Sequence, residues 1–104
     1  MKNLTPQEWS AQLSADQNAV IIDVRTPVEW RSGVIENAEL KNVMNPFKFK
    51  KWVLQLDKNK NYYVYCRSGV RSVNACKILE RKGIENTFNL VGGIQNWQGK
   101  IVNP

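Results

Sequence analysis

The chain has 104 residues, of which 42% are hydrophobic, and a formal net charge of +6. This length and composition predict one globular domain over residues 1–104, and no apolar run is long enough to span a membrane. There is no histidine and there are two cysteines. Dyads and metal sites that need an imidazole are therefore excluded, and two cysteines are too few for a structural zinc site.

The first predicted element is a helix, and two signals, a capping box and a proline, indicate where it begins. In "LTPQEW", Thr5 and Glu8 have the spacing of a capping box, and a proline stands at the first helical position. The run "AVIIDV" is continuously apolar before its aspartate, the pattern of a buried parallel strand. "TPVE" repeats the capping box before a short helix that Gly33 can end. The predicted elements are a helix to about residue 13, a strand at 19–24 and a short helix from 27.

The second half continues this alternation. Residues 38–43 predict a weaker strand, and Asn45 followed by proline predicts a helix over residues 46–56 with Asn45 as its cap. A strand at 62–65 precedes a helix at 70–82, which Gly83 ends. Its inward stripe consists of Ser72, Ala75, Cys76 and Leu79. A last strand is predicted at 86–91, and "GGIQNW" predicts a turn that enters a short helix.

Alternating strands and helices predict an α/β fold with a small parallel sheet of about five strands and helices on both faces. Ligands of such sheets bind beyond the carboxyl ends of the strands. Cys66 lies at such an end, directly after the strand at 62–65.

The segment "CRSGVRS" after that strand predicts an anion-binding loop. Gly69 tolerates the backbone angles that turn N–H groups inward, and the unpaired N–H groups of a helix that begins near Val70 point the same way. Arg67 and Arg71 add positive charge and are the activating groups expected near the sulfur. Such a setting lowers the pKa of a cysteine, so Cys66 is predicted to be a nucleophilic thiolate rather than a small core residue.

Cys76 leads to the opposite interpretation, because it lies on the inward stripe of the helix and is predicted to be an inert core residue. A disulfide with Cys66 is not expected. Six helical residues from Val70 to Cys76 rise roughly 9 Å, and a disulfide needs Cα atoms within roughly 7 Å.

Three segments resemble motifs of the rhodanese family, specifically of its single-domain members, and they occur along the chain in the same order as in that family. "CRSGVRS" resembles the active-site loop of that family, "IIDVRTPVEW" its N-terminal strand and turn, and "LVGGIQNW" its C-terminal signature. The residues that carry the last two likenesses are Asp23, Arg25, Glu29, Gly92, Gly93 and Trp97.

The resemblance implies a sulfurtransferase without a cofactor or metal. Cys66 would accept a sulfane sulfur from thiosulfate or a persulfide, become a persulfide itself, and pass the sulfur to cyanide, a thiol or an acceptor protein. The implied substrate-binding loop consists of Arg67, Ser68, Gly69, Val70 and Arg71. Asp23 and Arg25 are expected to pair and brace the loop region, and Gly92, Gly93 and Trp97 are interpreted as turn and core.

One segment departs from the family pattern of Gly-His-Ile-x-Gly-Ala. Here it reads "GVIENA", so that Val34 replaces the histidine and Asn37 replaces the second glycine. Asparagine is the next best residue for a left-handed turn. The expected consequence is a change of local packing rather than of chemistry.

Two alternatives stay open. The same architecture resembles Cdc25-type phosphatases and arsenate reductases, but their loop has five residues between cysteine and arginine, whereas four separate Cys66 from Arg71. A shorter loop favours a single sulfur atom over a tetrahedral phosphate. The second alternative is a non-catalytic binding module or partner-dependent sulfur carrier, docking through Lys48, Lys50 and Lys51.

Charge and the N-terminus complete the expectations. The basic excess suits an anionic partner, and "FKFKKW" at residues 47–52 fits a solvated helix face better than a nucleic-acid patch. Neither a nucleic acid nor a membrane is expected as a partner. The segment "MKNLTPQEWS" lacks the apolar core of a secretory signal, which predicts a cytoplasmic location.

Overall fold

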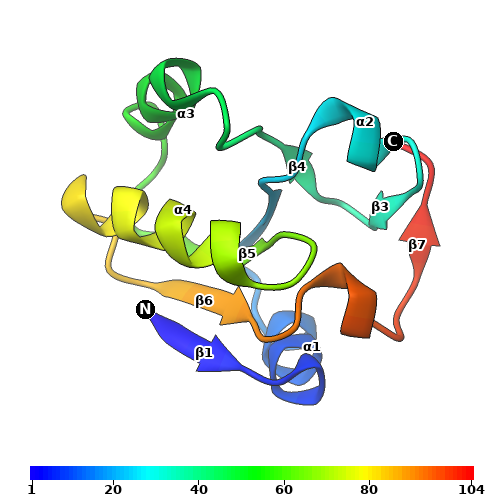
Figure 1. Cartoon of the computed structure of the whole chain (residues 1–104). Helices are drawn as coiled ribbons and strands as arrows, with labels where there is room; N and C mark the ends of the chain where they lie inside the picture. Colours follow the sequence, from blue (N-terminus) through cyan, green and yellow to red (C-terminus); the bar gives the residue numbers. More distant parts are fainter.

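The computed structural model describes residues 1–104, and its strands and helices alternate along the chain (Figure 1). In chain order the elements are β1 (Lys2–Leu4), α1 (Pro6–Ser14), β2 (Ala19–Asp23), α2 (Pro27–Trp30), β3 (Val34–Ile35), β4 (Glu39–Leu40), α3 (Pro46–Val53), β5 (Asn61–Tyr65), α4 (Val70–Arg81), β6 (Thr87–Leu90), the 3-10 helix η1 (Ile94–Asn96) and β7 (Ile101–Val102). None of the helices combines the length and the apolar character that a membrane crossing requires.

The central sheet has five strands in the order β1-β6-β5-β2-β4, and every pair is parallel. This confirms the predicted parallel α/β architecture. All strands therefore end at one edge of the sheet, and β5, which carries Cys66 directly after it, lies in the middle of the order. The sheet places the cysteine where three neighbouring strand ends converge.

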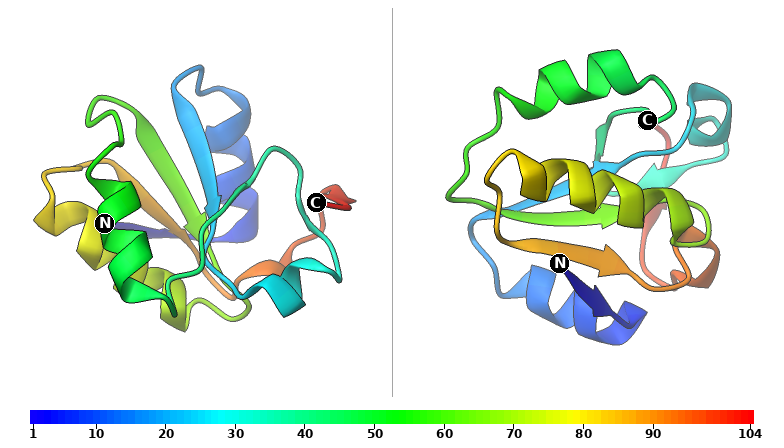
Figure 2. Two further views of the ribbon diagram at one scale, coloured as in Figure 1. Left: turned by 90° about the horizontal axis from the view of Figure 1, so that it is seen from above. Right: turned by 60° about the vertical axis from the view of Figure 1, so that its left-hand side comes forward.

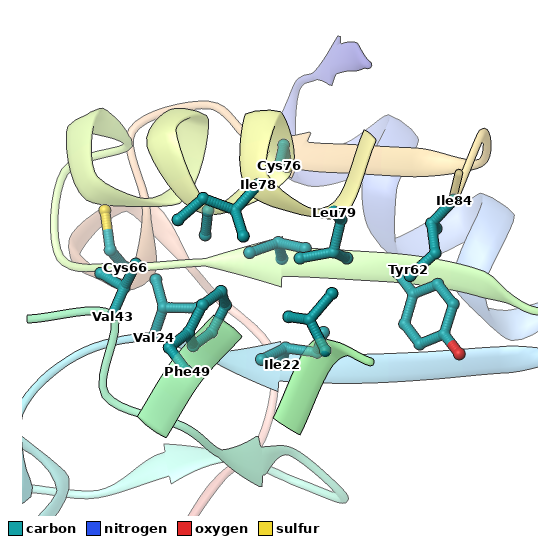
Figure 3. Close-up of a cluster of buried hydrophobic side chains, with 13 residues drawn as sticks. Ile22, Val24, Val43, Phe49, Tyr62, Cys66, Cys76, Ile78, Leu79 and Ile84 are labelled. Carbon is teal, nitrogen blue, oxygen red and sulfur yellow. The ribbon is translucent and has the colours of Figure 1, made fainter. Parts of the chain in front are cut away.

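Helices cover both faces of the sheet, as predicted: α3 and α4 lie on one side and α1 on the other (Figure 2). The alternation of side chains along β5 builds both cores. Tyr62, Val64 and Cys66 belong to the cluster under α3 and α4, drawn in Figure 3, whereas Tyr63 and Tyr65 belong to the cluster under α1. The cysteine is thus anchored in a packed layer of the core.

The capping signals gave all three helix starts correctly, but only two of the three cap residues form a side-chain cap. Thr5 with Glu8 and Thr26 with Glu29 form complete capping boxes. Asn45 occupies the cap position of α3, but its side chain makes no capping hydrogen bond. Its backbone lies at φ −107° and ψ 80° instead of the extended conformation of the two threonines, so its side chain is not aimed at the helix amides.

Strand lengths and number differ from the prediction. The predicted strand at 38–43 is regular only over Glu39–Leu40, although Lys41 and Val43 still donate backbone hydrogen bonds to β2 and its end. β1 was not predicted, because three residues give no readable period. Nor was the two-stranded antiparallel sheet of β3 and β7. These short strands depend on partners far along the chain.

Candidate active site

Cys66 follows the carboxyl end of β5 and is 1% exposed. The backbone N–H of Gly69 donates to its Sγ at 3.1 Å, and the hydroxyl of Ser72 lies 3.4 Å from the same atom. Gly69 has φ 105° and ψ −4°, the left-handed conformation that the sequence predicted for it. The sulfur therefore lies in a pocket of polar donors made by the loop and the first turn of α4.

The donors around the sulfur lower the pKa of the Cys66 thiol. Burial by itself raises the pKa of the Cys66 thiol, but hydrogen bonds from the Ser72 hydroxyl and from the backbone N–H groups of Ser72, Gly69 and Ser68 together outweigh it and leave the pKa below its usual value. Those donors favour the thiolate, which is the nucleophilic form of a cysteine. No imidazole takes part.

Ser72 is a site residue that the sequence analysis missed. It was placed on the inward core stripe of α4, and it is indeed fully buried, but its hydroxyl contacts Sγ and also donates to Oδ1 of Asn89 in β6. Asn89 in turn donates from its amide to Oδ1 of Asn3 in β1. A buried asparagine within the apolar run "TFNLV" was the one sequence signal for this chain of polar groups.

Arg71 forms an ion pair with Glu29, a partner that the sequence analysis did not assign to it. Its guanidinium forms two hydrogen bonds to the carboxylate of Glu29, at 2.7 and 2.8 Å. The pair ties the first turn of α4 to α2, forty-two residues earlier in the chain. The sequence placed Glu29 in a family motif and in a cap but gave no reason to join it to Arg71.

The remaining loop residues face outward. Arg67 and Ser68 are exposed, and Val70 is 76% exposed. The structure records no acidic partner for Arg67 among its ion pairs. Arg67 is therefore the unpaired cation of this loop, next to the sulfur in sequence.

The segment after β6 holds the beginning of the cysteine loop. The backbone N–H of Ile94 donates to the carbonyl of Cys66 at 2.9 Å, and that of Gln95 donates to the carbonyl of Arg67 at 3.3 Å. Gly92 and Gly93 have φ of 80° and 63°, as their interpretation as a turn requires. The glycine turn thus has a second role, because it brings two amides against the carbonyls that flank the sulfur.

Asp23 and Arg25 form the predicted salt bridge, at 2.8 Å, and both are buried. Arg25 also donates to the carbonyl of Gly33, and the indole of Trp30 donates to Asp23. These bonds hold α2 and the following turn against the end of β2. They support the Cys66 loop indirectly, because the same α2 carries Glu29.

The departing segment keeps its backbone shape. Asn37 adopts φ 71°, as predicted for a residue that replaces glycine in a left-handed turn. Val34 is buried and pairs with Val102 between β3 and β7. Val34, at the position of the family histidine, is therefore an apolar residue of a small sheet. It forms no hydrogen bond with the cysteine loop.

Cys76 is fully buried, and both cysteines are free, as expected. Burial raises the pKa of Cys76 to about 12. The pKa of Cys66 is thus lowered and that of Cys76 is raised, so the rates at which the two thiols are alkylated should differ.

Replacing Glu29 with Gln should lower the free energy of unfolding by about 1 kcal/mol at neutral pH, the scale of a partly exposed ion pair. The side-chain hydrogen bonds from Arg71 lower the pKa of Glu29 to about 2, whereas an unfolded glutamate titrates near about 4.3. The contribution is therefore present above that value and is lost as the pH falls toward 2. Urea unfolding at pH 7 and at about pH 2 measures it. An equal difference between the variants at both pH values would contradict the assignment.

A parallel sheet whose central strand ends in a buried cysteine, followed by a loop with backbone N–H donors, defines a class of α/β domains with a cysteine loop at the carboxyl ends of the strands. The chain belongs to the rhodanese-like domain family, whose sequence profile matches residues 5–100.

Individual relatives agree with this assignment. The chain is 35% identical over 101 residues to the putative sulfurtransferase YtwF of Bacillus subtilis (strain 168), covering 96% of this chain and 93% of that protein. It is 32% identical over 99 residues to a tRNA uridine(34) hydroxylase of Pelagibacter ubique, but spans only 33% of that protein. The crystal structure of a rhodanese-like domain protein from Staphylococcus aureus superposes with a TM-score of 0.82 at 32% identity, covering 100% of this chain and 99% of that one.

Proposed function

We propose that the chain is a sulfurtransferase that carries a sulfane sulfur on Cys66. The observation that carries the proposal is the sulfur environment: Sγ accepts from the Gly69 amide at 3.1 Å and lies 3.4 Å from the Ser72 hydroxyl, at the carboxyl edge of the sheet. The thiolate attacks the outer sulfur of an anionic donor such as thiosulfate. The S–S bond of the donor breaks, sulfite leaves with the electron pair, and Cys66 becomes a persulfide.

The second half-reaction returns the enzyme to its starting state. A thiolate or cyanide attacks the outer sulfur of the persulfide, the bond between the two sulfurs breaks, and Cys66 leaves as the thiolate that the loop donors stabilise. The same donors thus serve the nucleophile of the first step and the leaving group of the second. We also propose that the reaction takes place in the cytoplasm, with thiosulfate or a persulfide as donor and a thiol or cyanide as acceptor. The substrate is bound by the loop Arg67, Ser68, Gly69, Val70 and Arg71.

The burial of the cysteine supports sulfur transfer over phosphate chemistry. Cys66 is 1% exposed, and only four residues separate it from Arg71. A loop of this length leaves less space around the sulfur than the five-residue loops that surround a tetrahedral phosphate. A single sulfur atom added to Cys66, by contrast, needs little space, and it is this outer atom that an acceptor attacks.

The test is mass spectrometry of the intact protein after incubation with thiosulfate. We expect one added sulfur atom, which peptide mapping assigns to Cys66, and its removal by cyanide. Iodoacetamide should label Cys66 first, and the matched variant Cys76→Ala should retain both reactions, because only the pKa of Cys66 is lowered. Equal labelling of both cysteines, or hydrolysis of aryl phosphates without sulfur loading, would refute the proposal.

Replacing Arg67 with Ala should slow the reaction with thiosulfate several-fold at low salt, in line with about 1 kcal/mol for an exposed charge. The cause is electrostatic, so the difference from wild type should shrink as salt is added. The reaction with a neutral organic persulfide donor should change little. Kinetics at two ionic strengths measure this, with Arg31→Ala, an exposed arginine outside the loop, as the control. Equal loss in both variants would assign the effect to overall charge instead.

A further inference from the structure

The outer surface of α3 carries apolar side chains that no part of the chain covers. Phe47 is 80% exposed, Leu54 68% and Met44 64%. Phe47, Lys51 and Leu54 follow one line at spacings of four and three residues, from the second residue of α3 to its C-cap, and Met44 lies two residues before the helix. The opposite side of α3 buries Phe49 and Val53 in the core. Large exposed apolar side chains that cluster in this way mark interaction sites on soluble domains.

Lysines surround these apolar side chains. A depression of about 300 Å³ is lined by Phe47, Lys50, Lys51, Leu54 and Lys82, with no acidic residue among them. We call these five residues together with Met44 the α3 surface. The α3 surface has an apolar centre and a positive border. Lys48, which the sequence analysis grouped with its neighbours, lines a different depression beside Trp52.

The α3 surface begins at the edge of the sheet that holds the cysteine. Val43, directly before Met44, donates a backbone hydrogen bond to Val24, and Val24 donates to Tyr65, the neighbour of Cys66. Val43 and Cys66 also belong to one packed cluster and lie at the same end of it in Figure 3. A protein seated on α3 can therefore extend over the strand ends toward the cysteine loop.

We propose that the α3 surface docks an acidic protein that exchanges sulfur with Cys66, an inference that rests on the proposed sulfur transfer. The partner presents carboxylates to Lys50, Lys51 and Lys82 and apolar side chains to Phe47 and Leu54. Its cysteine, as a persulfide, gives its outer sulfur to the Cys66 thiolate and leaves as a thiolate. In the reverse direction its thiolate attacks the persulfide on Cys66.

Charge and composition favour this occupant over the others. A second copy of the chain would bring the same lysines face to face across a symmetric interface, and like charges repel. A site for single-stranded nucleic acid offers several aromatic rings on which the bases stack, whereas the depression has one phenylalanine. An apolar centre inside a charged border is the usual composition of a protein–protein interface.

The test uses two synthetic peptides that each carry one cysteine persulfide. One surrounds it with glutamates and leucines, and the other has glutamine in place of every glutamate. Sulfur transfer to wild-type protein should be about tenfold faster from the acidic peptide at low salt, and added salt should reduce this preference. The double variant Lys51→Glu with Lys82→Glu should lose the preference, as should Phe47→Ser with Leu54→Ser.

The matched control is Lys2→Glu with Lys60→Glu, at two exposed lysines, which changes the net charge by the same amount outside the α3 surface and should keep the preference. Loading by thiosulfate should be the same in all variants. NMR titration with the reduced acidic peptide tests docking without sulfur chemistry and should shift the amides of α3. If wild type takes up no sulfur from thiosulfate or from either peptide, the proposed function fails, whatever the titration shows.

Three outcomes would overturn the docking proposal while leaving sulfur transfer intact. The first is equal rates from both peptides. The second is an equal effect of the control and surface variants. The third is stronger binding at α3 of a single-stranded RNA oligonucleotide, of anionic phosphatidylserine vesicles or of a second copy of the chain, detected by the same titration or by sedimentation.

Discussion

Gly93→Ala is expected to destabilise the domain by several kcal/mol and to remove most of the reactivity of Cys66. Gly93 has φ 63° and ψ −161°, a region that is essentially restricted to glycine and costs about 1–3 kcal/mol for other residues. A Cβ atom there would collide with the carbonyl oxygen of Arg67 and lie 2.6 Å from that of Cys66. Relieving these collisions adds a cost of about 1–3 kcal/mol and pushes the cysteine loop outward.

Gly83→Ala provides the matched control. Gly83 also has a positive φ, of 89°, but its added Cβ would meet only the end of the flexible Lys58 side chain, at 3.3 Å. It ends α4, at the opposite end of the helix from the loop. Both variants should lose stability in urea unfolding, but only Gly93→Ala should slow alkylation of Cys66 under conditions where both are folded. If both variants alkylate alike, the turn does not position the loop.

Ser72→Ala is expected to slow alkylation and sulfur loading of Cys66 by about tenfold near neutral pH, the effect of losing one hydrogen bond to a charged group. In the hydrogen bond with Asn89 the Ser72 hydroxyl is the donor, because Oδ1 carries no hydrogen. The thiolate therefore gains its hydrogen bond when this hydroxyl turns toward Sγ, 3.4 Å away. Without the hydroxyl the pKa of Cys66 rises, and less thiolate is present at a given pH.

The pH profile separates this role from a structural one. The rate deficit of Ser72→Ala should disappear at high pH, where the thiol is ionised in both proteins, whereas a distorted loop would stay slow. Ser68→Ala makes the same chemical change on an exposed residue of the same loop, and its alkylation rate should match wild type, because the backbone N–H of residue 68 is retained. A deficit that persists unchanged into alkaline solution would mean that Ser72 only shapes the site.

The sequence by itself determined the architecture and the position of Cys66, the candidate nucleophile. Capping boxes at Thr5 and Thr26, the apolar run of β2 and the strand before Cys66 are local signals, because caps, turns and burial patterns act over a few residues. The alternation of elements then implied a parallel sheet. The left-handed backbone of Gly69 and Asn37 was predictable for the same reason, since it depends on the residue and its immediate neighbours.

Only the tertiary structure decided which distant groups hold the neighbours of the sulfur in place. Ser72 and Asn89 lie seventeen residues apart, and Arg71 and Glu29 forty-two, so no local pattern joins them. The sheet order brings β6 beside β5, which puts Asn89 within reach of Ser72 and the amides of Ile94 and Gln95 against the cysteine loop. Hydrogen bonds and ion pairs act over a few ångströms in space, and the chain specifies such neighbours only after it has folded.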